Sequence, residues 1–497
     1  MQSRSFFGCD VRDEHFNTAI IATIGPASSD AATLERMFDA GVNIVRLNFS
    51  HGDTTGHART LEAVRAAARS RGIPVAVLGD LPGPKIRLVE VEGDGFDLIA
   101  GSETTFARSC QTVTSAQELG CTMCDMVDWV QPGHSVLIND GQIRLEAVRS
   151  VPDGIVCRVV VGGRITSHKG VNLPDTTLDI DMPTPRDREM AAWAVEHELD
   201  WLAMSFVRSA EDISSLEACL CECAGQQRRP MPIIAKMEVP AAIACASAIA
   251  QEADAMMVAR GDLGVELDLA EVPAVQKHLM SICRDADLPC IIATQMLESM
   301  IESPVPTRAE ASDVANSVFD GADAVMLSGE TAVGAYPIET VEVMNRITCT
   351  TEAAMRSMHL VSGGDLESPR VTRISGETAL THGVWSAAID ADACCIIVRS
   401  HTGGWARRLS RNNVLLPVLA LTDDERIVRR MLLYRGVTPV YIEQLPDGPA
   451  LWELAEREVR ARRWADDGDH VVLVTGSPVR PGDASASVVV HRLDSSG

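Results

Sequence analysis

Two apolar runs, PIIAKME at residues 232–238 and AMMVARGD at residues 255–262, each end in charged residues. Continuous apolar runs of this length are typical of parallel strands that are buried on both faces of a sheet. Because each run turns from apolar to charged at its end, the charged side chains would lie together at one edge of that sheet. The two runs therefore predict neighbouring buried strands whose carboxyl ends carry chemistry.

The same form recurs along the first part of the chain. Six further runs are AIIATIG (19–25), NIVRLNFSHG (43–52), PVAVLGD (74–80), DWLAMSF (200–206), PCIIATQ (289–295) and AVMLSGE (324–330). Helical patterns separate the runs, and in one of them Thr184 is expected to cap the helix, with Pro185 in its first turn and Asp187 completing a capping box. Eight repeats predict a (β/α)8 TIM barrel, an α/β fold whose active site lies at the carboxyl ends of the strands. Those ends carry Arg46, Asn48, Asp80, Lys236, Glu238, Asp262, Thr294, Ser328 and Glu330.

Two other segments depart from this pattern. Between the third and fourth runs, Val/Thr/Gly alternation and turn signals predict a small β-barrel inserted into a βα loop, as a lid above the active-site face. After residue 350, apolar runs alternate with helical stretches again, which predicts an open-sheet α/β domain. The predicted domains are an N-terminal segment (1–17), the catalytic barrel (18–83 and 183–350), the insert (84–182) and the C-terminal domain (351–497).

The net charge and the cysteine content exclude some classes of function. The 497-residue chain carries a net charge of −25, which argues against non-specific binding to nucleic acid or to an acidic membrane surface. A local basic cluster that binds small anions is compatible with this charge. The 14 cysteines are scattered and often lie in apolar runs, as expected of reduced thiols in a cytoplasmic protein. The pair CTMC (121–124) is interpreted as structural, and no targeting peptide or bilayer-spanning stretch is expected.

The charged strand ends suggest a metal site. Glu238 and Asp262 end consecutive strands, and two carboxylates at one mouth suit a hard divalent cation that keeps some waters for a substrate. Lys236 lies two residues before Glu238, so both side chains point to the same face of the strand. A structural salt bridge is the alternative, but a lysine beside a metal is also what an enolate or phosphoryl intermediate needs for charge stabilisation.

Other groups suit anions. The stretch ARGDLG (259–264) is expected to be a turn that opens towards a helix, with free N–H groups facing a small carboxylate or phosphate. Arg46 and Arg87 add guanidinium groups that match phosphate geometry. Lys169, in the insert, and His51 are ambiguous by themselves. A divalent metal, several cations and a lid together predict phosphoryl transfer with a small carboxylate partner.

Two glycine-rich turns follow strands in the C-terminal domain, SHTGGW at 400–405 and TGSPVRPG at 475–482. Backbone N–H groups in such turns can cradle phosphate. A single glycine-rich turn says little, but two in one domain bring an effector site into consideration. An effector site and plain connecting loops both remain open on these residues alone.

These motifs resemble those of the pyruvate kinase family. They run through the barrel and the insert in the family's order: TIGPAS, RLNFSHG, GPKIR, KGVNLP, SFVR, MVARGDLGVE, ATQMLESM, PTRAEASDVANSV and DGADAVMLSGETAVGAYP. In the C-terminal domain the clearest match is LYRGVTPV at 433–440. The resemblance implies transfer of the phosphoryl group of phosphoenolpyruvate to ADP, giving pyruvate and ATP in the last step of glycolysis.

The resemblance also implies roles for the strand-end residues. Lys236 would stabilise the transferring phosphoryl group and the enolate, and Arg46 would clamp the phosphate. Glu238 and Asp262 would be the ligands of Mg²⁺ or Mn²⁺. The family is usually a homotetramer whose C-terminal domain binds a phosphorylated effector, and this chain is expected to be similar.

Substrate and nucleotide contacts are implied in the same way. The substrate carboxylate would lie against Thr294 and the backbone N–H groups of Gly261 and Asp262. Thr294 and Ser328 would belong to the relay that protonates the enolate through water. The nucleotide would lie near Pro26, Asn48, His51, Arg87, Asp140 and Lys169.

The stretch VLGDLPGPKIRL (77–88) bears on potassium. Most family members bind a monovalent cation near the substrate, and such members typically carry a glutamate where this chain has Lys85. A tethered ammonium can supply the charge of that ion. The chain therefore resembles the bacterial-type, potassium-independent branch, and K⁺ is not expected to be required. The positions that match the cation site are Asn48, Ser50, Asp80 and the backbone carbonyl of Leu81.

The chain departs from the family pattern in two places. The lysine motif reads KMEVP, which keeps the spacing of Lys236 and Glu238 and is expected to alter only local packing. The turn at 400–405 keeps Ser400 and Thr402 as candidate effector contacts, but Trp405 stands where the family usually has a hydroxyl. An indole there is expected to fill the phosphate pocket.

Two alternatives to a kinase were considered. Another metal-dependent barrel enzyme that handles an enolate, such as an aldolase or a phosphoenolpyruvate mutase, would share the lysine and the metal but would not need Lys169 or the insert. A catalytically inactive homologue could act as a sensor of phosphorylated metabolites through its C-terminal domain. The presence of Lys236, Glu238 and Asp262 argues against this second alternative.

Overall fold

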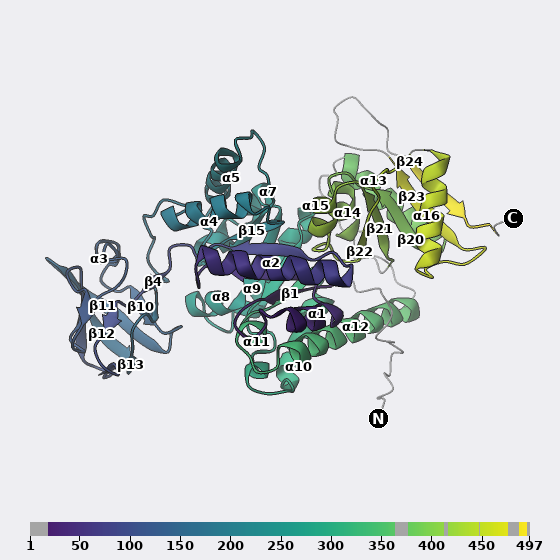
Figure 1. Cartoon of the computed structure of the whole chain (residues 1–497). Helices are drawn as coiled ribbons and strands as arrows, with labels where there is room; N and C mark the ends of the chain where they lie inside the picture. The colour runs from purple at the N-terminus through teal and green to yellow at the C-terminus, as the bar shows by residue number, and fades with distance from the viewer. Residues whose placement is uncertain (1–17, 363–375, 412–415, 447, 476–486, 495–497) are drawn as a thin grey trace.

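The computed structural model describes residues 18–362, 376–411, 416–446, 448–475 and 487–494. It has a central barrel, an inserted β domain and a C-terminal α/β domain, and the last two lie at opposite ends of the barrel (Figure 1). The predicted N-terminal segment (1–17) lies outside the described residues. Most of the second glycine-rich turn, residues 476–482, also lies outside them.

Eight parallel strands close into the central barrel, in the order β1-β19-β18-β17-β16-β15-β3-β2. Almost every residue of these strands is buried, because one face points into the barrel and the other lies under the surrounding helices. All eight apolar runs are strands, and the predicted (β/α)8 barrel is confirmed. The strands are β1 (Ala19–Thr23), β2 (Ile44–Asn48), β3 (Ala76–Asp80), β15 (Trp201–Met204), β16 (Ile233–Met237), β17 (Ala255–Ala259), β18 (Cys290–Ala293) and β19 (Ala324–Leu327).

Helices connect the strands and surround the barrel. The predicted capping box is present, since the Thr184 hydroxyl accepts from the Asp187 N–H at 3.1 Å and the Asp187 carboxylate accepts from the Thr184 N–H at 3.0 Å. The last helix crosses residue 350, so the predicted domain boundary falls inside a helix. The helices are α1 (Ala31–Asp39), α2 (Thr54–Arg71), α4 (Pro185–Glu196), α5 (Ala210–Ala224), α6 (Pro240–Ala244), α7 (Ala246–Glu252), α8 (Arg260–Glu266), α9 (Val272–Asp285), η1 (Glu298–Ile301), α10 (Arg308–Phe319), α11 (Gly329–Ala332) and α12 (Pro337–Ser362).

The insert between β3 and α4 is a β domain with its own apolar core. A small β-barrel was expected, and the strands pair as a seven-stranded sheet, in the order β4-β14-β10-β11-β12-β7-β9, together with two two-stranded sheets. The edge strands β4 and β9 have two residues each, and a short antiparallel bridge joins these two edges of the sheet. The Thr122 N–H donates to the Arg87 carbonyl at 2.8 Å, and the Val89 N–H donates to the Gly120 carbonyl at 3.1 Å. The elements are β4 (Ile86–Arg87), β5 (Glu90–Val91), β6 (Phe96–Leu98), β7 (Glu103–Ala107), β8 (Thr112–Val113), β9 (Glu118–Leu119), α3 (Met126–Trp129), β10 (Ser135–Ile138), β11 (Ile143–Val151), β12 (Gly154–Val161), β13 (Gly163–Ile165) and β14 (Gly170–Asn172).

The C-terminal domain is a five-stranded sheet with the order β22-β21-β20-β23-β24. Four of its strands are parallel, and β24 runs antiparallel to β23. This confirms the predicted open α/β sheet. The elements are α13 (Gly376–Asp390), β20 (Ala393–Arg399), α14 (Gly404–Ser410), β21 (Val418–Thr422), α15 (Glu425–Met431), β22 (Val437–Tyr441), α16 (Pro449–Ala461), β23 (His470–Thr475) and β24 (Ser487–Arg492).

The C-terminal domain closes the amino-terminal end of the barrel. Leu433, which follows α15, is fully buried and belongs to the same apolar cluster as the barrel-interior residues Ile21 and Trp201. The Tyr434 ring meets the Trp201 ring edge-on, with centroids 6.4 Å apart. The barrel interior and the C-terminal domain therefore share one apolar core at this end.

The described helices include none that is both long and apolar enough to cross a lipid bilayer. The cysteines among the described residues are free thiols, and most of them are buried. Cys121 is buried and Cys124 is half-buried, and burial raises the pKa of the Cys121 thiol to about 11. A thiol with a raised pKa is a poor nucleophile and metal ligand, which agrees with the structural interpretation of this pair.

Candidate active site

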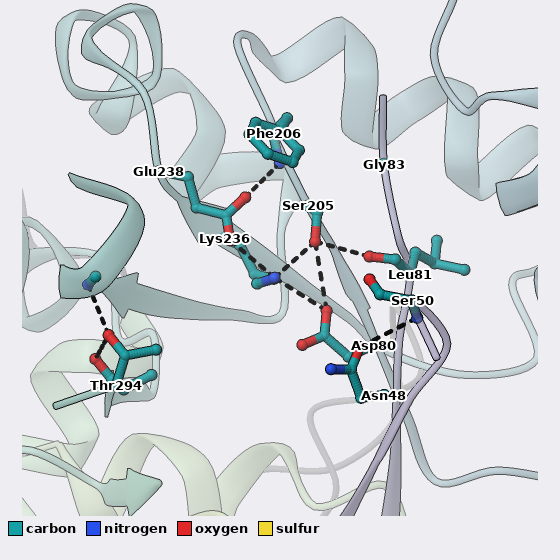
Figure 2. Close-up of polar contacts among 12 residues, drawn as sticks. Asn48, Ser50, Asp80, Leu81, Gly83, Ser205, Phe206, Lys236, Glu238 and Thr294 are labelled. Atoms are coloured by element: carbon teal, nitrogen blue, oxygen red, sulfur yellow. Dashed lines mark hydrogen bonds and ion pairs between the residues drawn. The ribbon is translucent and has the colours of Figure 1, made fainter. Parts of the chain in front are cut away.

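Lys236 lies at the carboxyl end of β16 with its ammonium group surrounded by three partners. Its Nζ is 3.1 Å from Asp80 Oδ1, 2.8 Å from Glu238 Oε1 and 2.6 Å from Ser205 Oγ. Figure 2 shows Lys236 between Glu238 and Asp80, with Ser205 beside it. Burial by itself would lower the pKa of Lys236, but the two carboxylates raise it above its usual value. The site therefore keeps a permanent positive charge at the centre of the strand ends.

Asp80, at the end of β3, joins this lysine to a guanidinium. Arg46 donates to Asp80 Oδ2 from Nε at 2.7 Å and lies 2.7 Å from the same oxygen through Nη2, while its Nη1 donates to Thr23 Oγ1 at 3.0 Å. Burial by itself would raise the pKa of Asp80, but Lys236 and Arg46 hold it below its usual value. Two cations thus converge on one buried carboxylate.

Glu238 lies just beyond β16, and both of its oxygens have partners. Oε1 faces Lys236, and Oε2 accepts from the Phe206 N–H at 2.7 Å (Figure 2). Phe206 has a left-handed backbone, φ 56°, which turns that N–H towards the carboxylate. Burial raises the pKa of Glu238, the Lys236 ammonium opposes this shift, and the Asp262 carboxylate adds to it.

Asp262 was expected at the end of a strand, but β17 ends at Ala259 and Asp262 lies in the first turn of α8. No group of three or more His, Cys, Asp and Glu side chains in the described part of the chain is arranged to hold a metal ion. The pair Glu238 and Asp262 fits a divalent cation that takes its remaining ligands from water and substrate, because Mg²⁺ is commonly held by one or two carboxylates plus substrate oxygens.

Thr294 lies across the mouth of the barrel from Lys236 (Figure 2). Its Oγ1 accepts from the Gly261 N–H at 2.7 Å and donates to the Ala293 carbonyl at 2.6 Å. Thr294 has φ 67°, a conformation that is strained for a β-branched residue and that proteins mostly retain at functional sites. Thr294 and Gly261, two of the groups expected to contact the substrate carboxylate, are thus hydrogen-bonded to each other, and the Gly261 N–H, which was expected to be free, is not.

Ser328 follows β19 and begins α11. Its hydroxyl is buried and has no hydrogen-bond partner among the described residues, while its N–H donates to Glu330 Oε2 at 2.7 Å. A buried hydroxyl without a partner is unusual and is found at sites where a water or ligand completes its hydrogen bonding.

The predicted cation-site residues lie together beside Asp80. Asn48 Oδ1 accepts from the Ser50 N–H at 3.1 Å, and the Leu81 carbonyl accepts from Ser205 Oγ at 2.7 Å (Figure 2). Lys85 is exposed four residues beyond Leu81, and no hydrogen bond or ion pair of its side chain is found among the described residues. Its positive charge reaches this edge of the site, since it contributes to lowering the pKa of His51.

The predicted nucleotide contacts come from the barrel (Pro26, Asn48 and His51) and from the insert (Arg87, Asp140 and Lys169). Burial lowers the pKa of His51, and the positive charges of Arg87 and Lys85 lower it further. Arg87 bonds the carbonyl of His168 at 3.1 Å, next to the half-buried Lys169. Pro26 lies exposed beyond β1, and Asp140 lies exposed in the insert at φ 53°.

The glycine-rich turn at 400–405 differs from expectation at Trp405. The indole does not fill a pocket in the turn; it is buried in the apolar core of the C-terminal domain, because it lies one residue into α14 with its side chain facing the sheet. The Ser400 hydroxyl is buried without a hydrogen-bond partner among the described residues, and Thr402 is exposed.

Ser205 was not among the predicted site residues. It accepts from Lys236 and donates to the Leu81 carbonyl, so it joins the lysine to the β3 end. Its place at the carboxyl end of the run DWLAMSF, the same position that pointed to Thr294 and Ser328 in other runs, was a signal that could have found it. Thr23, the partner of Arg46 at the end of β1, was also missed.

Comparisons with known proteins decide the family. Residues 15–341 match the family model of the pyruvate kinase barrel domain, and residues 378–490 match that of the pyruvate kinase alpha/beta domain. The chain belongs to the pyruvate kinase family. A pyruvate kinase of Agrobacterium vitis is 39% identical over 459 residues, which cover 92% of this chain and 93% of that relative. One of Thermotoga maritima is 34% identical over 478 residues, covering 96% of this chain and 100% of the relative.

A solved pyruvate kinase structure, from Cryptosporidium parvum, has a TM-score of 0.88 and 31% identity, and covers 96% of both chains. Pyruvate kinases transfer the phosphoryl group of phosphoenolpyruvate to ADP, in the last step of glycolysis. The match extends over both domains and nearly the whole chain, so this chain is an enzyme of that kind. The pyruvate kinase barrel supplies the strand ends on which Lys236, Asp80 and Glu238 meet.

Proposed function

We propose that Lys236 and Arg46 bind the phosphoryl group of phosphoenolpyruvate and stabilise its transfer to ADP. The observation that carries this proposal is the buried Lys236 ammonium, held within 3.1 Å of Asp80, Glu238 and Ser205 at the strand ends. In the reaction, the bond between phosphorus and the enol oxygen breaks as a terminal oxygen of ADP bonds to phosphorus. The electron pair stays on the enol oxygen, where the fixed charge of Lys236 stabilises the enolate.

Glu238 and Asp262 would hold Mg²⁺ or Mn²⁺ in this site. The fit rests on the placement of the two carboxylates, just beyond β16 and in the first turn of α8, where the Asp262 charge adds to the raised pKa of Glu238. A bound divalent ion neutralises developing charge on phosphoryl and enolate oxygens. Lys236 already faces Glu238, so the chain's own contribution is to orient that carboxylate while Phe206 fixes its other oxygen.

The enolate must then receive a proton at its methylene carbon. Ser328 and Thr294 are proposed to hold the water that delivers it. The partnerless buried hydroxyl of Ser328 supports this role, as does the strained backbone that directs Thr294 towards Gly261. The substrate carboxylate would take the Thr294 and Gly261 groups as its partners.

Lys85 is proposed to replace a monovalent cation, as in the bacterial-type, potassium-independent branch. In support, the residues that match the cation site, Asn48, Ser50, Asp80 and Leu81, are adjacent to one another at one edge of the mouth. Lys85 is the exposed cation that follows them along the chain. The Lys85 ammonium would act on the cation site through its electrostatic field rather than through a direct contact.

The nucleotide is proposed to lie towards the insert, against Pro26, His51, Arg87, Asp140 and Lys169, with the insert acting as a lid. The cluster of cations near His51 supports the placement of polyphosphate there. We further propose a homotetramer located in the cytoplasm, with Ser400 and Thr402 as phosphate contacts for an effector. The burial of Trp405 in the core supports an effector turn that is not blocked by the indole.

The test is formation of pyruvate and ATP from phosphoenolpyruvate and ADP, with Mg²⁺ and K⁺ varied independently. We expect activity that requires Mg²⁺ and persists without K⁺. An inactive homologue that senses phosphorylated metabolites would form no ATP at saturating Mg²⁺ but would still bind its ligand. Loss of activity on Lys236→Met, with the fold retained by circular dichroism, would support the assigned role, and unchanged activity would refute it.

A further inference from the structure

The insert projects from one end of the barrel (Figure 1), and its strands contact the barrel through a single polar pair. Asn172, the last residue of β14, donates from Nδ2 to Glu266 Oε1 at 2.9 Å. Within the described residues, this is the one hydrogen bond found between the strands of the insert and the barrel, and no ion pair joins them. One side-chain pair therefore connects the two parts at this face.

Further polar contacts lie on the two segments that link the insert to the barrel. In the outgoing segment, the Gly83 N–H donates to Asp187 Oδ1 at 2.9 Å. In the returning segment, Arg208 donates to the carbonyls of Leu178 and Ile180 at 2.7 and 2.9 Å. These contacts fix the points where the chain leaves and rejoins the barrel. The orientation of the sheet between those points then depends on the pair described above.

A cavity of about 260 Å³ lies beside this pair, between the insert and the barrel. Asn172 and Glu266 both line it, together with Val171 from the insert and Phe206 and Pro240 from the barrel. Side chains that line an unfilled space lose the dispersion contacts that close packing would give them. Apolar packing therefore supports the insert weakly here, and the hydrogen bond carries more of its orientation.

On the insert, this pair holds the strand next to the expected nucleotide contacts. β14 pairs with both β4 and β10, and it ends at Asn172. Arg87 lies on β4, and the neighbouring Leu88 N–H donates to the Lys169 carbonyl at 2.8 Å, just before β14. Asp140 follows β10. Arg87, Asp140 and Lys169 thus lie on or beside three neighbouring strands, so the contact that places β14 places all three.

On the barrel, the pair is anchored to α8. Glu266 is the last residue of this helix, about one turn beyond Asp262. The turn after β10 also approaches α8, since a Cβ atom on Gly141 would lie 3.9 Å from Val265 Cγ1. The helix that carries Asp262 is therefore also the helix against which the insert is held.

We propose that Glu266 is a positioning residue that holds the insert, through Asn172, in the orientation in which Arg87, Asp140 and Lys169 reach the nucleotide. This inference rests on the proposed place of the nucleotide. If the insert leaves this orientation for part of the time, the apparent affinity for ADP falls in proportion to the fraction of molecules that keep it. The groups proposed to bind phosphoenolpyruvate belong to the barrel, so its binding should not depend on this contact.

The first test is steady-state kinetics of the full-length enzyme with Mg²⁺. Asn172→Ala and Glu266→Ala should each raise KM for ADP about five- to tenfold and leave KM for phosphoenolpyruvate within about twofold. Glu266→Gln keeps an acceptor oxygen and should stay within about twofold of the parent in both. The double alanine variant should raise KM for ADP no further than either single variant, because each of them already removes the contact. Damage to α8 as a whole would instead raise the Mg²⁺ requirement, since Asp262 lies on the same helix.

The second test measures the insert without substrates. Hydrogen exchange of the linking segments, residues 81–88 and 173–183, should be faster in the two alanine variants than in the parent and in Glu266→Gln. The matched control is Arg164→Ala, in the insert. Arg164 bonds the Asp94 carbonyl and pairs with Asp97, both within the insert, so its loss should change neither this exchange nor KM for ADP.

Unchanged exchange in both alanine variants overturns the proposal. So does a double variant whose effect on KM is the product of the single effects, or a Glu266→Gln enzyme that behaves like Glu266→Ala. Lys169→Ala separates this inference from the placement of the nucleotide. If Lys169→Ala raises KM for ADP and the alanine variants of the pair do not, the positioning role is overturned. If none of these variants changes KM while exchange is faster, the proposed place of the nucleotide is wrong and the pair still holds the insert.

Discussion

Removing the Ser205 hydroxyl should weaken catalysis without changing any charge. Lys236 has three N–H donors, and the contacts to Asp80, Glu238 and Ser205 use all three. The Ser205 contact is the shortest of them, at 2.6 Å, and the same hydroxyl donates to the Leu81 carbonyl at 2.7 Å. In Ser205→Ala, the ammonium loses one of its three anchors, and Leu81 loses the donor to its carbonyl.

The size of the effect follows from these contacts. A hydrogen bond to a charged group contributes about 1.5–3 kcal/mol, and each 1.4 kcal/mol in the barrier corresponds to a factor of about ten. If the anchor matters mainly when Lys236 stabilises developing charge, kcat should fall about 10- to 100-fold. An anchor that acts equally on bound substrate and transition state would instead raise KM with kcat unchanged.

The assay is steady-state formation of pyruvate, with kcat and KM for phosphoenolpyruvate measured separately. Ser205→Cys, which keeps a weak acceptor in a similar volume, should lose less than Ser205→Ala. Ser214→Ala, on the exposed side of α5, removes a hydroxyl that bonds only the Ala210 carbonyl and should leave both parameters unchanged. A Ser205→Ala enzyme with kcat within about twofold of the parent would show that the two carboxylates position Lys236 by themselves.

Three further outcomes are expected. In Lys85→Glu, adding K⁺ should raise the activity at least tenfold. The matched charge reversal Arg457→Glu should not create this dependence. A parent enzyme that is inactive in K⁺-free buffer would contradict the prediction. Leu433→Ala should lower the free energy of unfolding by about 2–5 kcal/mol, and the half-buried Leu432→Ala by less; equal shifts in thermal unfolding would contradict the shared core. Burial raises the pKa of Glu266 to about 7. Without Mg²⁺, the free energy of unfolding of the parent should therefore fall by up to about 3 kcal/mol between pH 4.5 and pH 8, compared with that of Glu266→Gln. A raised pKa in the folded state favours folding at low pH, and a pH-independent difference in urea unfolding would refute this.

The strands of the barrel could be predicted because burial on both faces leaves a strong pattern. PIIAKME and AMMVARGD contain β16 and β17, and the charged residues follow them as expected. The spacing of Lys236 and Glu238 predicted that both side chains point to the same face, and their 2.8 Å contact agrees with this and forms the salt bridge considered as the alternative. These features depend on local periodicity, which a single sequence carries.

Contacts between distant segments were harder to predict. Asp80 and Lys236 meet because β3 pairs with β15 after the long insert, and β15 pairs with β16. The sequence indicated separate uses for the two residues, a monovalent-cation site for Asp80 and charge stabilisation for Lys236, and gave no sign of their 3.1 Å ion pair. Ser205 lies at a strand end like Thr294 and Ser328, but its contact with Lys236 depends on the pairing of β15 with β16, which the sequence does not show. The burial of Trp405 depends on which face of α14 meets the sheet, which one helical turn of sequence does not determine.

The packing of Leu433 into the amino-terminal end of the barrel has a consequence for folding during synthesis. Strands β1 to β19 end at Leu327, yet Leu433, which completes their interior, is translated about a hundred residues later. Domains generally fold in order as they leave the ribosome. During synthesis, the nascent barrel therefore exposes an open apolar end for the time needed to translate the following segment. A chain that ends before residue 433 would have the eight strands of the barrel but would lack Leu433, which fills its interior at this end.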